Sequence, residues 1–364
     1  MTKVLVVDDS ALARKLLIGI FAAEGDFEVA SARNGHEALE MARSFAPDVI
    51  TLDIRMPDMD GLAFLDRLMV ENPRPVVMVS SLTAAGAAAT LEAMRLGAVD
   101  FVAKPSGAIS LDINRMAPLL VGKVRAASRA RIQNSLRLVE RVRQRIGNLR
   151  PVAAPGVQRP TTAHVPAVRH AAGAGLGLVL IGTSTGGPPA LEMVLGGLPG
   201  DLPWPVLVAQ HMPASFTGAL ARRLAGLCAL DVVEVARPTP LLAGRIYIAR
   251  GDADMVVSRR PGGLVVVAAP GLPDYPWHPS VERMVTSAME HIDARRLVGV
   301  LMTGMGRDGV DAMTRLRAAG GRTIAESEAT AVVWGMPGEL VRAGGAEVVV
   351  DVNEIANRLN EMVV

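Results

Sequence analysis

The sequence is poor in aromatic residues and nearly lacks cysteine. Its 364 residues include six Phe, three Trp and two Tyr, about 3% in total. A buried core must therefore be aliphatic, and the overall hydrophobic fraction of 50% is large enough to supply one or two such cores. Cys228 is the single cysteine, which excludes an intrachain disulfide and disfavours a cysteine-based metal site. This usage is typical of a reducing compartment.

Long apolar runs are missing as well. No run approaches the roughly 18 residues of a membrane-spanning helix. Only four apolar residues separate Lys3 from Asp8, too few for the apolar core of a signal peptide. We therefore expect a cytoplasmic protein that is not membrane-embedded.

Positive charge is concentrated in one segment. In residues 123–191 Lys and Arg outnumber Asp and Glu by 11 to 1, whereas the segments on both sides carry net negative charge. Such a distribution is typical of a solvated linker between acidic domains. We expect no nucleic-acid binding, because the chain has neither a helix-turn-helix pattern nor an aromatic stacking platform.

The chain divides into two parts that each alternate short apolar runs with amphipathic stretches. In residues 1–122, helical patterns follow the capping residues Ser10, Asn34 and Asp60. Apolar runs too short for helices predict buried parallel strands at Val4–Val7, Val49–Leu52, Val76–Val79 and Phe101–Ala103. This alternation indicates a doubly wound α/β domain.

Residues 123–174 are expected to connect the two parts. An Arg-rich helical pattern runs from Leu111 to Ile146, and a stretch rich in Pro, Ala and Gly follows, which predicts a basic helix and a flexible linker. Residues 175–364 are expected to form a second α/β domain. Its candidate strands are Leu176–Ile181, Val206–Ala209, Arg245–Ala249, Leu264–Ala268, Val298–Met302, Thr323–Ala325 and Glu347–Val350.

Acidic residues follow two of the expected strands in the first domain. Asp8 and Asp9 come after the first strand, and Asp53 comes after Val49–Leu52. The carboxyl ends of neighbouring parallel strands meet at one edge of a sheet, so three carboxylates converge there. Mg²⁺ relieves their repulsion and can bridge to phosphoryl oxygens. Lys104 and Ser80, also at strand ends, offer a positive charge and a hydroxyl to a phosphoryl group.

The segments Val-Asp8-Asp9-Ser and Asp53-Ile-Arg-Met-Pro57, together with Ser80 and Lys104-Pro105, resemble the response-regulator receiver family. The resemblance covers about residues 1–120 and implies a flavodoxin-like fold with five parallel strands. It implies that a chemotaxis histidine kinase phosphorylates Asp53.

The same resemblance assigns further roles. Asp8, Asp9 and Asp53 hold Mg²⁺ with the backbone carbonyl of Arg55, Ser80 and Phe101 are switch residues, and Lys104 is the family's lysine.

A serine flanked by glycines lies between a strand and a helix in the second domain. The segment Gly182-Thr183-Ser184-Thr185-Gly186-Gly187 is followed by Pro188-Pro189, typical of a first helical turn. Such a turn presents a nucleophile at a helix N-terminus, where backbone N–H groups can stabilise an oxyanion. The alternative interpretation is a glycine-rich phosphate-binding loop, although this segment lacks the lysine of a P-loop.

Two further groups complete a possible catalytic triad. His211 follows the run Val206–Ala209 and can act as a general base near neutral pH. Asp308, which follows Val298–Met302, is the best-placed carboxylate to orient it. The chain order Ser, His, Asp differs from that of α/β-hydrolases, chymotrypsin and subtilisin.

Four segments resemble the catalytic domain of the chemotaxis protein-glutamate methylesterase family (CheB). They are Ile-Gly-Thr-Ser184-Thr-Gly-Gly, Gln210-His211-Met-Pro, Leu-Met-Thr-Gly-Met305-Gly-Arg-Asp308-Gly and Ala331-Val-Val-Trp334-Gly-Met-Pro337. The resemblance implies a Rossmann-like domain over residues 175–364 that needs no cofactor. It implies an enzyme that removes methyl esters from chemoreceptor glutamates and deamidates receptor glutamines, which resets receptor signalling in adaptation.

Carried over by position, Ser184 is the nucleophile, His211 the general base and acid, and Asp308 its orienting group. Thr185 resembles the hydroxyl neighbour of the histidine, and the N–H of Met305 resembles an oxyanion-hole donor.

The sequence departs from the family where His-Arg-Pro-Ser-Val-Asp is usual, because Trp277 and His278 replace the first two residues. Two other classes of function stay open from the sequence. They are a receiver fused to a non-enzymatic binding domain and a transcriptional regulator.

Overall fold

The structure is a computed structural model that describes residues 1–80, 83–104, 109–130 and 176–363. The boundary expected after residue 122 falls inside helix α5 (Ile109–Ser128). The expected linker beyond residue 130, with the rest of the helical pattern towards Ile146, lies outside the described residues. Within the described ranges, no helix is both long and apolar enough to cross a bilayer.

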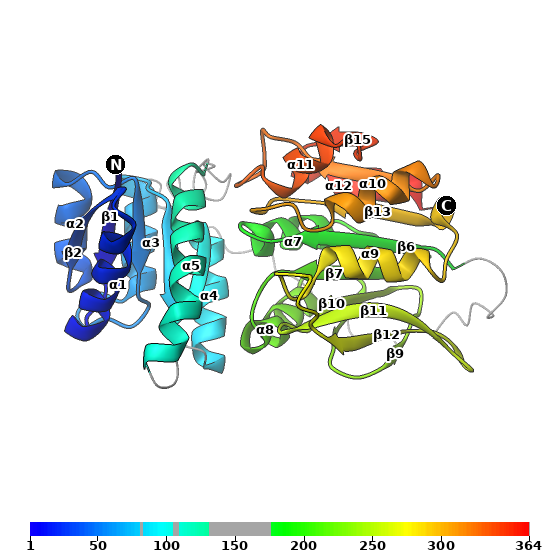
Figure 1. Ribbon diagram of the computed structural model, residues 1–364, viewed down its shortest axis with the longest axis horizontal. Coiled ribbons are helices and arrows are strands. Elements are labelled where there is room, and N and C mark those ends of the chain that lie inside the picture. Colours follow the sequence, from blue (N-terminus) through cyan, green and yellow to red (C-terminus); the bar gives the residue numbers. More distant parts are fainter. Residues whose placement is uncertain (81–82, 105–108, 131–175, 364) are drawn as a thin grey trace, which may run out of the picture. The chain divides into compact units, whose positions relative to one another are not determined.

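The N-terminal part contains a five-stranded parallel sheet with strand order β2-β1-β3-β4-β5 (Figure 1). The doubly wound five-stranded domain expected from the sequence is therefore confirmed. The strands are β1 (Thr2–Val7), β2 (Phe27–Ala32), β3 (Val49–Leu52), β4 (Val76–Ser80) and β5 (Asp100–Ala103). The helices are α1 (Ala11–Glu24), α2 (Gly35–Ser44), α3 (Gly61–Glu71), α4 (Ala84–Leu96) and α5.

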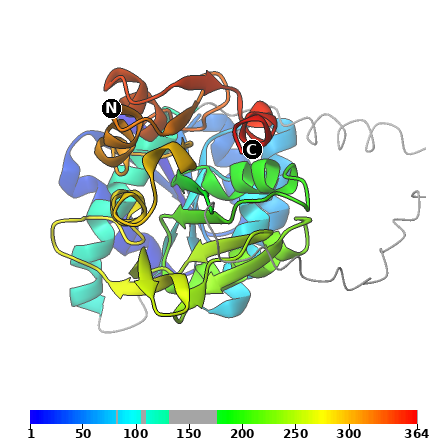
Figure 2. The ribbon, with the colours of Figure 1, turned by 90° about the vertical axis from the view of Figure 1, so that its right-hand side faces the viewer.

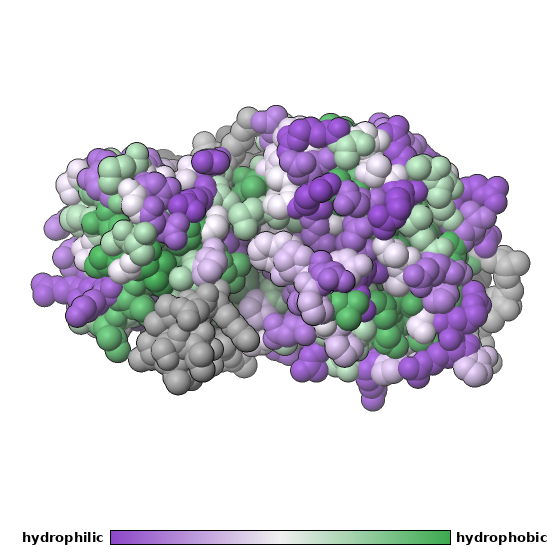
Figure 3. Space-filling view, viewed as in Figure 1, coloured by the Kyte–Doolittle hydropathy of each residue, from purple (hydrophilic) through white to green (hydrophobic). Residues whose placement is uncertain are grey.

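Capping side chains start three of these helices, as the sequence predicts. Ser10, Asn34 and Asp60 each accept a hydrogen bond from the backbone N–H three residues later. Strand β2 has no apolar run, because it is an edge strand with the polar residues Glu28 and Ser31 in its sequence. Hydrophobic residues gather over α1 (Figure 3), where Leu12 is 64% exposed.

The C-terminal part is built on a seven-stranded sheet with strand order β15-β14-β13-β6-β7-β10-β8, in which every pairing is parallel (Figure 1). All seven candidate strands of the second domain are found. Six belong to this sheet, whereas Leu264–Ala268 belongs to a separate antiparallel sheet, and the strand at Asp231–Val235 was not predicted. The strands of this sheet are β6 (Leu178–Thr183), β7 (Val206–Gln210), β8 (Asp231–Val235), β10 (Arg245–Ala249), β13 (Leu297–Leu301), β14 (Arg322–Glu326) and β15 (Val348–Val350).

Helices cover this sheet, and a small antiparallel sheet lies beside it (Figure 2). The antiparallel sheet has the order β11-β12-β9 and was not expected from the sequence. It contains β9 (Thr239–Pro240), β11 (Ala253–Arg260) and β12 (Gly263–Pro270). The helices are α7 (Gly187–Gly196), α8 (Ala214–Ala225), α9 (Val281–Met289), α10 (Val310–Ala318), α11 (Met336–Arg342) and α12 (Val352–Met362), with a 3₁₀ turn at Ala294–Arg296. Its core is mainly aliphatic, as the low aromatic content requires.

Candidate functional site

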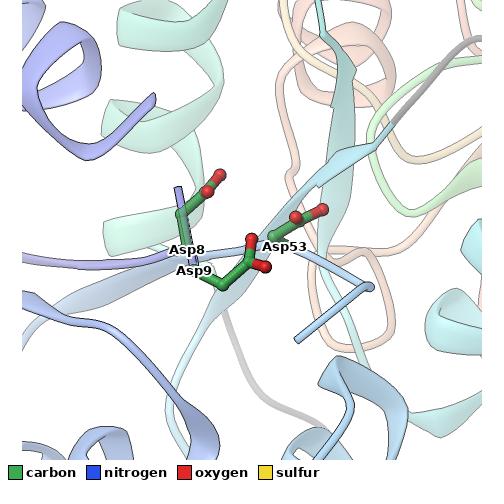
Figure 4. Close-up of side chains that lie close together, drawn as sticks. All are labelled: Asp8, Asp9 and Asp53. Carbon is green, nitrogen blue, oxygen red and sulfur yellow. The ribbon is translucent and has the colours of Figure 1, made fainter. Parts of the chain in front are cut away.

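Three carboxylates meet at the carboxyl edge of the N-terminal sheet (Figure 4). One oxygen from each of Asp8, Asp9 and Asp53 lies within 4.8 Å of the other two. The strand register explains the meeting, because Val7 of β1 pairs with Leu52 of β3, Asp8 and Asp53 directly follow these residues, and Asp9 comes next after Asp8. Asp8 and Asp53 are buried, whereas Asp9 is exposed.

Lys104 lies against two of these acids. Its Nζ is 2.8 Å from Oδ2 of Asp8 and 2.8 Å from Oδ2 of Asp53. Burial raises the pKa of Asp53 despite the opposing effect of Lys104, and the negative charge of Asp8 raises it further. One ammonium group does not neutralise three carboxylates, so negative charge remains at this edge. The carboxylates also form an all-oxygen donor set, which suits a divalent cation.

The remaining receiver residues predicted from the sequence lie on β4, on β5 and in the loop after β3. Ser80 ends β4, and its hydroxyl donates to the carbonyl oxygen of Gly86 at 3.4 Å. Phe101 is a buried residue of β5, and Arg55 is an exposed residue of the loop that follows β3.

Ser184 directly follows β6, and α7 begins three residues later. The turn between them requires glycine, because Gly186 has φ +78° and a Cβ there would lie 2.7 Å from Val332. The backbone N–H of Ser184 donates to the carbonyl oxygen of Thr303 at 3.0 Å. Gly304 allows this close approach, since a Cβ on it would lie 2.8 Å from the Cβ of Ser184.

His211 and Asp308 form a hydrogen-bonded pair. Nε2 of His211 is 2.8 Å from Oδ2 of Asp308, and both side chains are almost fully buried. Thr183 pairs with Gln210 in the β6–β7 register, so Ser184 and His211 occupy neighbouring strand ends. Nδ1 of His211 is buried and has no hydrogen-bond partner among the described residues. In this structure Ser184 and His211 therefore do not share a hydrogen bond.

The carboxylate of Asp308 is held in its charged form. Burial alone raises the pKa of this group, but the hydrogen bond with His211 and the N–H groups of Val281 and Glu282 outweigh burial and lower it. These two N–H groups lie 2.7 and 3.1 Å from the carboxylate oxygens at the start of α9. A charged carboxylate beside Nε2 favours the imidazole tautomer whose lone pair is on Nδ1.

Met305 and Thr185, the two residues expected to support the triad, differ in their surroundings. Met305 lies in the loop after β13, and its backbone N–H makes no hydrogen bond among those of the described residues. The hydroxyl of Thr185 donates to the carboxylate of Asp100. Among the described residues, Thr185 and His211 share no hydrogen bond, since Nε2 of His211 is bonded to Asp308 and its Nδ1 has no partner.

The structure places two further residues, Glu326 and Trp277, near the triad. Glu326, at the end of β14, is 1% exposed and accepts a hydrogen bond from the N–H of Thr303 at 2.7 Å. Burial raises its pKa to about 7. Trp277 stacks on the imidazole of His211. No sequence pattern distinguishes Glu326 from other glutamates at strand ends. Trp277 could be noticed in the sequence, because it differs from the residue that is usual in the family.

Comparisons with known proteins match both parts of the chain. A family model described as the CheB methylesterase matches residues 179–359, and one described as the response regulator receiver domain matches residues 4–113. A solved structure, the CheB methylesterase catalytic domain of Thermotoga maritima, is 34% identical with a TM-score of 0.50. It covers 52% of this chain and 100% of its own.

Two curated relatives align with nearly the whole chain. One, from Rhodopseudomonas palustris (strain BisB18), is 59% identical and covers 98% of this chain and 96% of its own. It is named protein-glutamate methylesterase/protein-glutamine glutaminase 2. Another, from Rhodospirillum rubrum, is 52% identical, covers 99% of this chain and 96% of its own, and carries the same name with the number 3.

Proposed function

The chain belongs to the CheB methylesterase family, and from this premise we propose that it hydrolyses methyl esters of receptor glutamates with Ser184, His211 and Asp308 as a triad. One observation carries the assignment. Nε2 of His211 bonds to Asp308 at 2.8 Å, which leaves its buried Nδ1 free at the strand end beside Ser184.

The reaction follows from this geometry. The hydroxyl oxygen of Ser184 attacks the γ-carbonyl of the methylated glutamate as its proton passes to Nδ1 of His211. The N–H of Met305 stabilises the resulting oxyanion. Collapse of the tetrahedral intermediate expels methoxide, which takes the proton from His211 and leaves as methanol. Water then hydrolyses the acyl-enzyme by the same route, and the receptor glutamate regains its negative charge.

The same triad would deamidate a receptor glutamine. The leaving group is then ammonia instead of methanol, and the product is again glutamate. A chemoreceptor is therefore the proposed substrate of both reactions.

We propose that Asp53 is phosphorylated by a chemotaxis histidine kinase. Asp8, Asp9 and Asp53 would hold Mg²⁺ together with the backbone carbonyl of Arg55, and the cation would neutralise charge on the transferred phosphoryl group. Lys104 would bind a phosphoryl oxygen, and Ser80 and Phe101 would respond to it as switch residues. The apolar exposed face of α1 beside the acidic cluster supports docking of a phosphodonor protein at this edge.

Phosphorylation is proposed to regulate access to the triad. The hydroxyl of Thr185 donates to Asp100, and the N–H of Gly186 donates to the carbonyl oxygen of Val99 at 3.1 Å. These bonds join the nucleophile turn to the start of β5, the strand that leads to Lys104. They support a role of the unphosphorylated receiver in restraining the nucleophile turn.

The test is methanol release from methylated receptor membranes, with and without a small-molecule phosphodonor and Mg²⁺. We expect wild-type turnover to rise with the phosphodonor. Ser184→Ala should lose several orders of magnitude, while Ser215→Ala, an exposed serine of α8, should match wild type. Substantial turnover by Ser184→Ala would rule out the nucleophile assignment.

A further inference from the structure

The indole of Trp277 lies flat against the imidazole of His211. The ring centroids are 5.5 Å apart and the planes differ by 8°. Trp277 belongs to the connection between β12 and α9 and is only partly buried. Its Nε1 lies beside the loop after β13, since a Cβ on Gly306 would come within 3.8 Å of it. The indole therefore stacks on one face of a ring whose Nε2 is already bonded to Asp308.

A buried carboxylate anchors the segment that carries Trp277. Asp254 of β11 is fully buried, and its Oδ1 lies 2.9 Å from Nδ1 of His278 and 2.7 Å from the N–H of Ser280. Its Oδ2 accepts from Arg283 at 2.6 Å. The residue next to Trp277 is thus tied to the antiparallel sheet on one side.

The same segment is tied to the triad on its other side. The hydroxyl of Ser280 donates to Oδ1 of Asp308 at 3.0 Å, and the N–H of Val281 donates to Oδ2 at 2.7 Å. A short stretch of chain therefore touches both members of the His211–Asp308 pair, with Trp277 on the ring and α9 on the carboxylate.

The hydrogen bond to Asp308 does not by itself fix the imidazole. It restrains one nitrogen, whereas rotation about the outer side-chain torsion of histidine is governed by a broad and roughly two-fold potential. A flat partner on the ring face opposes that rotation, because turning the ring would break the stack. The indole face also attracts a cation, and the imidazole becomes one whenever it holds the serine proton.

We propose that Trp277 is a positioning residue for the hydrolysis. Its indole holds the imidazole of His211 in the plane that keeps Nε2 on Asp308 and Nδ1 available to Ser184, and it stabilises the imidazolium formed during each proton transfer. The inference rests on the proposed role of His211 as general base. It assigns a function to a residue at which the chain departs from its family.

The experiment compares Trp277→Ala and Trp277→Phe with wild type in the full-length phosphorylated enzyme. We expect Trp277→Ala to lower kcat about five- to thirtyfold with little change in KM, since the stack acts on the transition state. Trp277→Phe retains a flat ring and should recover most of the loss. Leu272→Ala, which removes an exposed apolar side chain from the same connection, is the matched control and should match wild type.

A double-mutant cycle with His211→Gln separates positioning from substrate contact. If Trp277 acts through His211, Trp277→Ala should not lower the residual activity of the His211→Gln enzyme further. The same fold loss in that background, or a rise in KM alone, would assign Trp277 to substrate binding and overturn the inference. Wild-type kcat in Trp277→Ala would overturn it as well. An inactive wild type would instead overturn the proposed function.

Discussion

The backbone N–H of Thr303 donates to Oε2 of Glu326 at 2.7 Å, which places a buried carboxyl against a residue that contacts the nucleophile turn. The carbonyl oxygen of Thr303 accepts from the N–H of Ser184 at 3.0 Å. Its hydroxyl donates to the carbonyl oxygen of Thr185 at 2.8 Å. Glu326 is therefore two hydrogen bonds from the serine, although it lies on a different strand.

Glu326 should make the stability of the protein fall as pH rises. Burial raises its pKa from 4.5 to about 7, and hydrogen bonds from Thr303 and Thr330 only partly oppose this. The folded protein keeps a proton that the unfolded chain loses. The contribution is therefore fully present below pH 4.5, is lost progressively between pH 4.5 and 7, and amounts to about 3 kcal/mol.

Urea unfolding of wild type and Glu326→Gln at pH 5 and pH 8 measures this effect. The amide oxygen of glutamine can accept from Thr303 without titrating, so the variant should lack this part of the pH dependence. After burial, the neighbouring carboxylate of Asp351 also raises the pKa of Glu326, and this neighbour is unchanged in the variant. Identical pH dependence in both proteins would contradict the prediction.

Asp308→Asn should lower kcat by about 10³- to 10⁴-fold, by loss of the correct imidazole tautomer. Both oxygens of Asp308 accept hydrogen bonds from the start of α9 and from Ser280. Either orientation of an asparagine would therefore turn its NH₂ group towards a donor. Steady-state methanol release checks this result. Asp311→Asn, an exposed aspartate paired with Arg307, is the control, and equal losses in the two variants would argue against the triad.

Asp53→Asn should abolish activation by a phosphodonor and leave unstimulated activity intact. An amide cannot accept the phosphoryl group, whereas the triad residues are unaltered. Incorporation of labelled phosphate, measured with Mg²⁺ and with excess chelator, checks both the residue and the cation. Asp58→Asn is a matched control, because Asp58 is exposed in the same loop and its φ of 66° suits asparagine. Chelator-insensitive labelling would refute the magnesium site.

Removal of residues 1–150 should raise unstimulated esterase activity. The deletion removes Asp100 and Val99, the hydrogen-bond partners of Thr185 and Gly186. The remaining part aligns along the whole of a catalytic domain solved by itself. Methanol release without phosphodonor, per mole of enzyme, is the measurement. Unchanged or lower activity of the truncated protein would argue against restraint by the receiver.

Sequence patterns predicted the two α/β domains because apolar runs and capping residues act locally. They located Asp8, Asp53, Ser184 and His211 at strand ends, where parallel pairing brings side chains together. The antiparallel sheet was missed although Leu264–Ala268 was predicted as a strand. Its partner β11 was not predicted, and composition does not reveal that the two strands pair antiparallel.

The order of residues along the chain determined which strands end in an acid, a serine or a histidine, and therefore which chemistry the two sheet edges offer. Only tertiary packing decided that Trp277 stacks on His211 and that Glu326 accepts a hydrogen bond from Thr303. These contacts join segments 66 and 23 residues apart, and neither partner carries a local signal for the other. Their existence depends on how the loops close over the sheet, which short-range propensity does not encode.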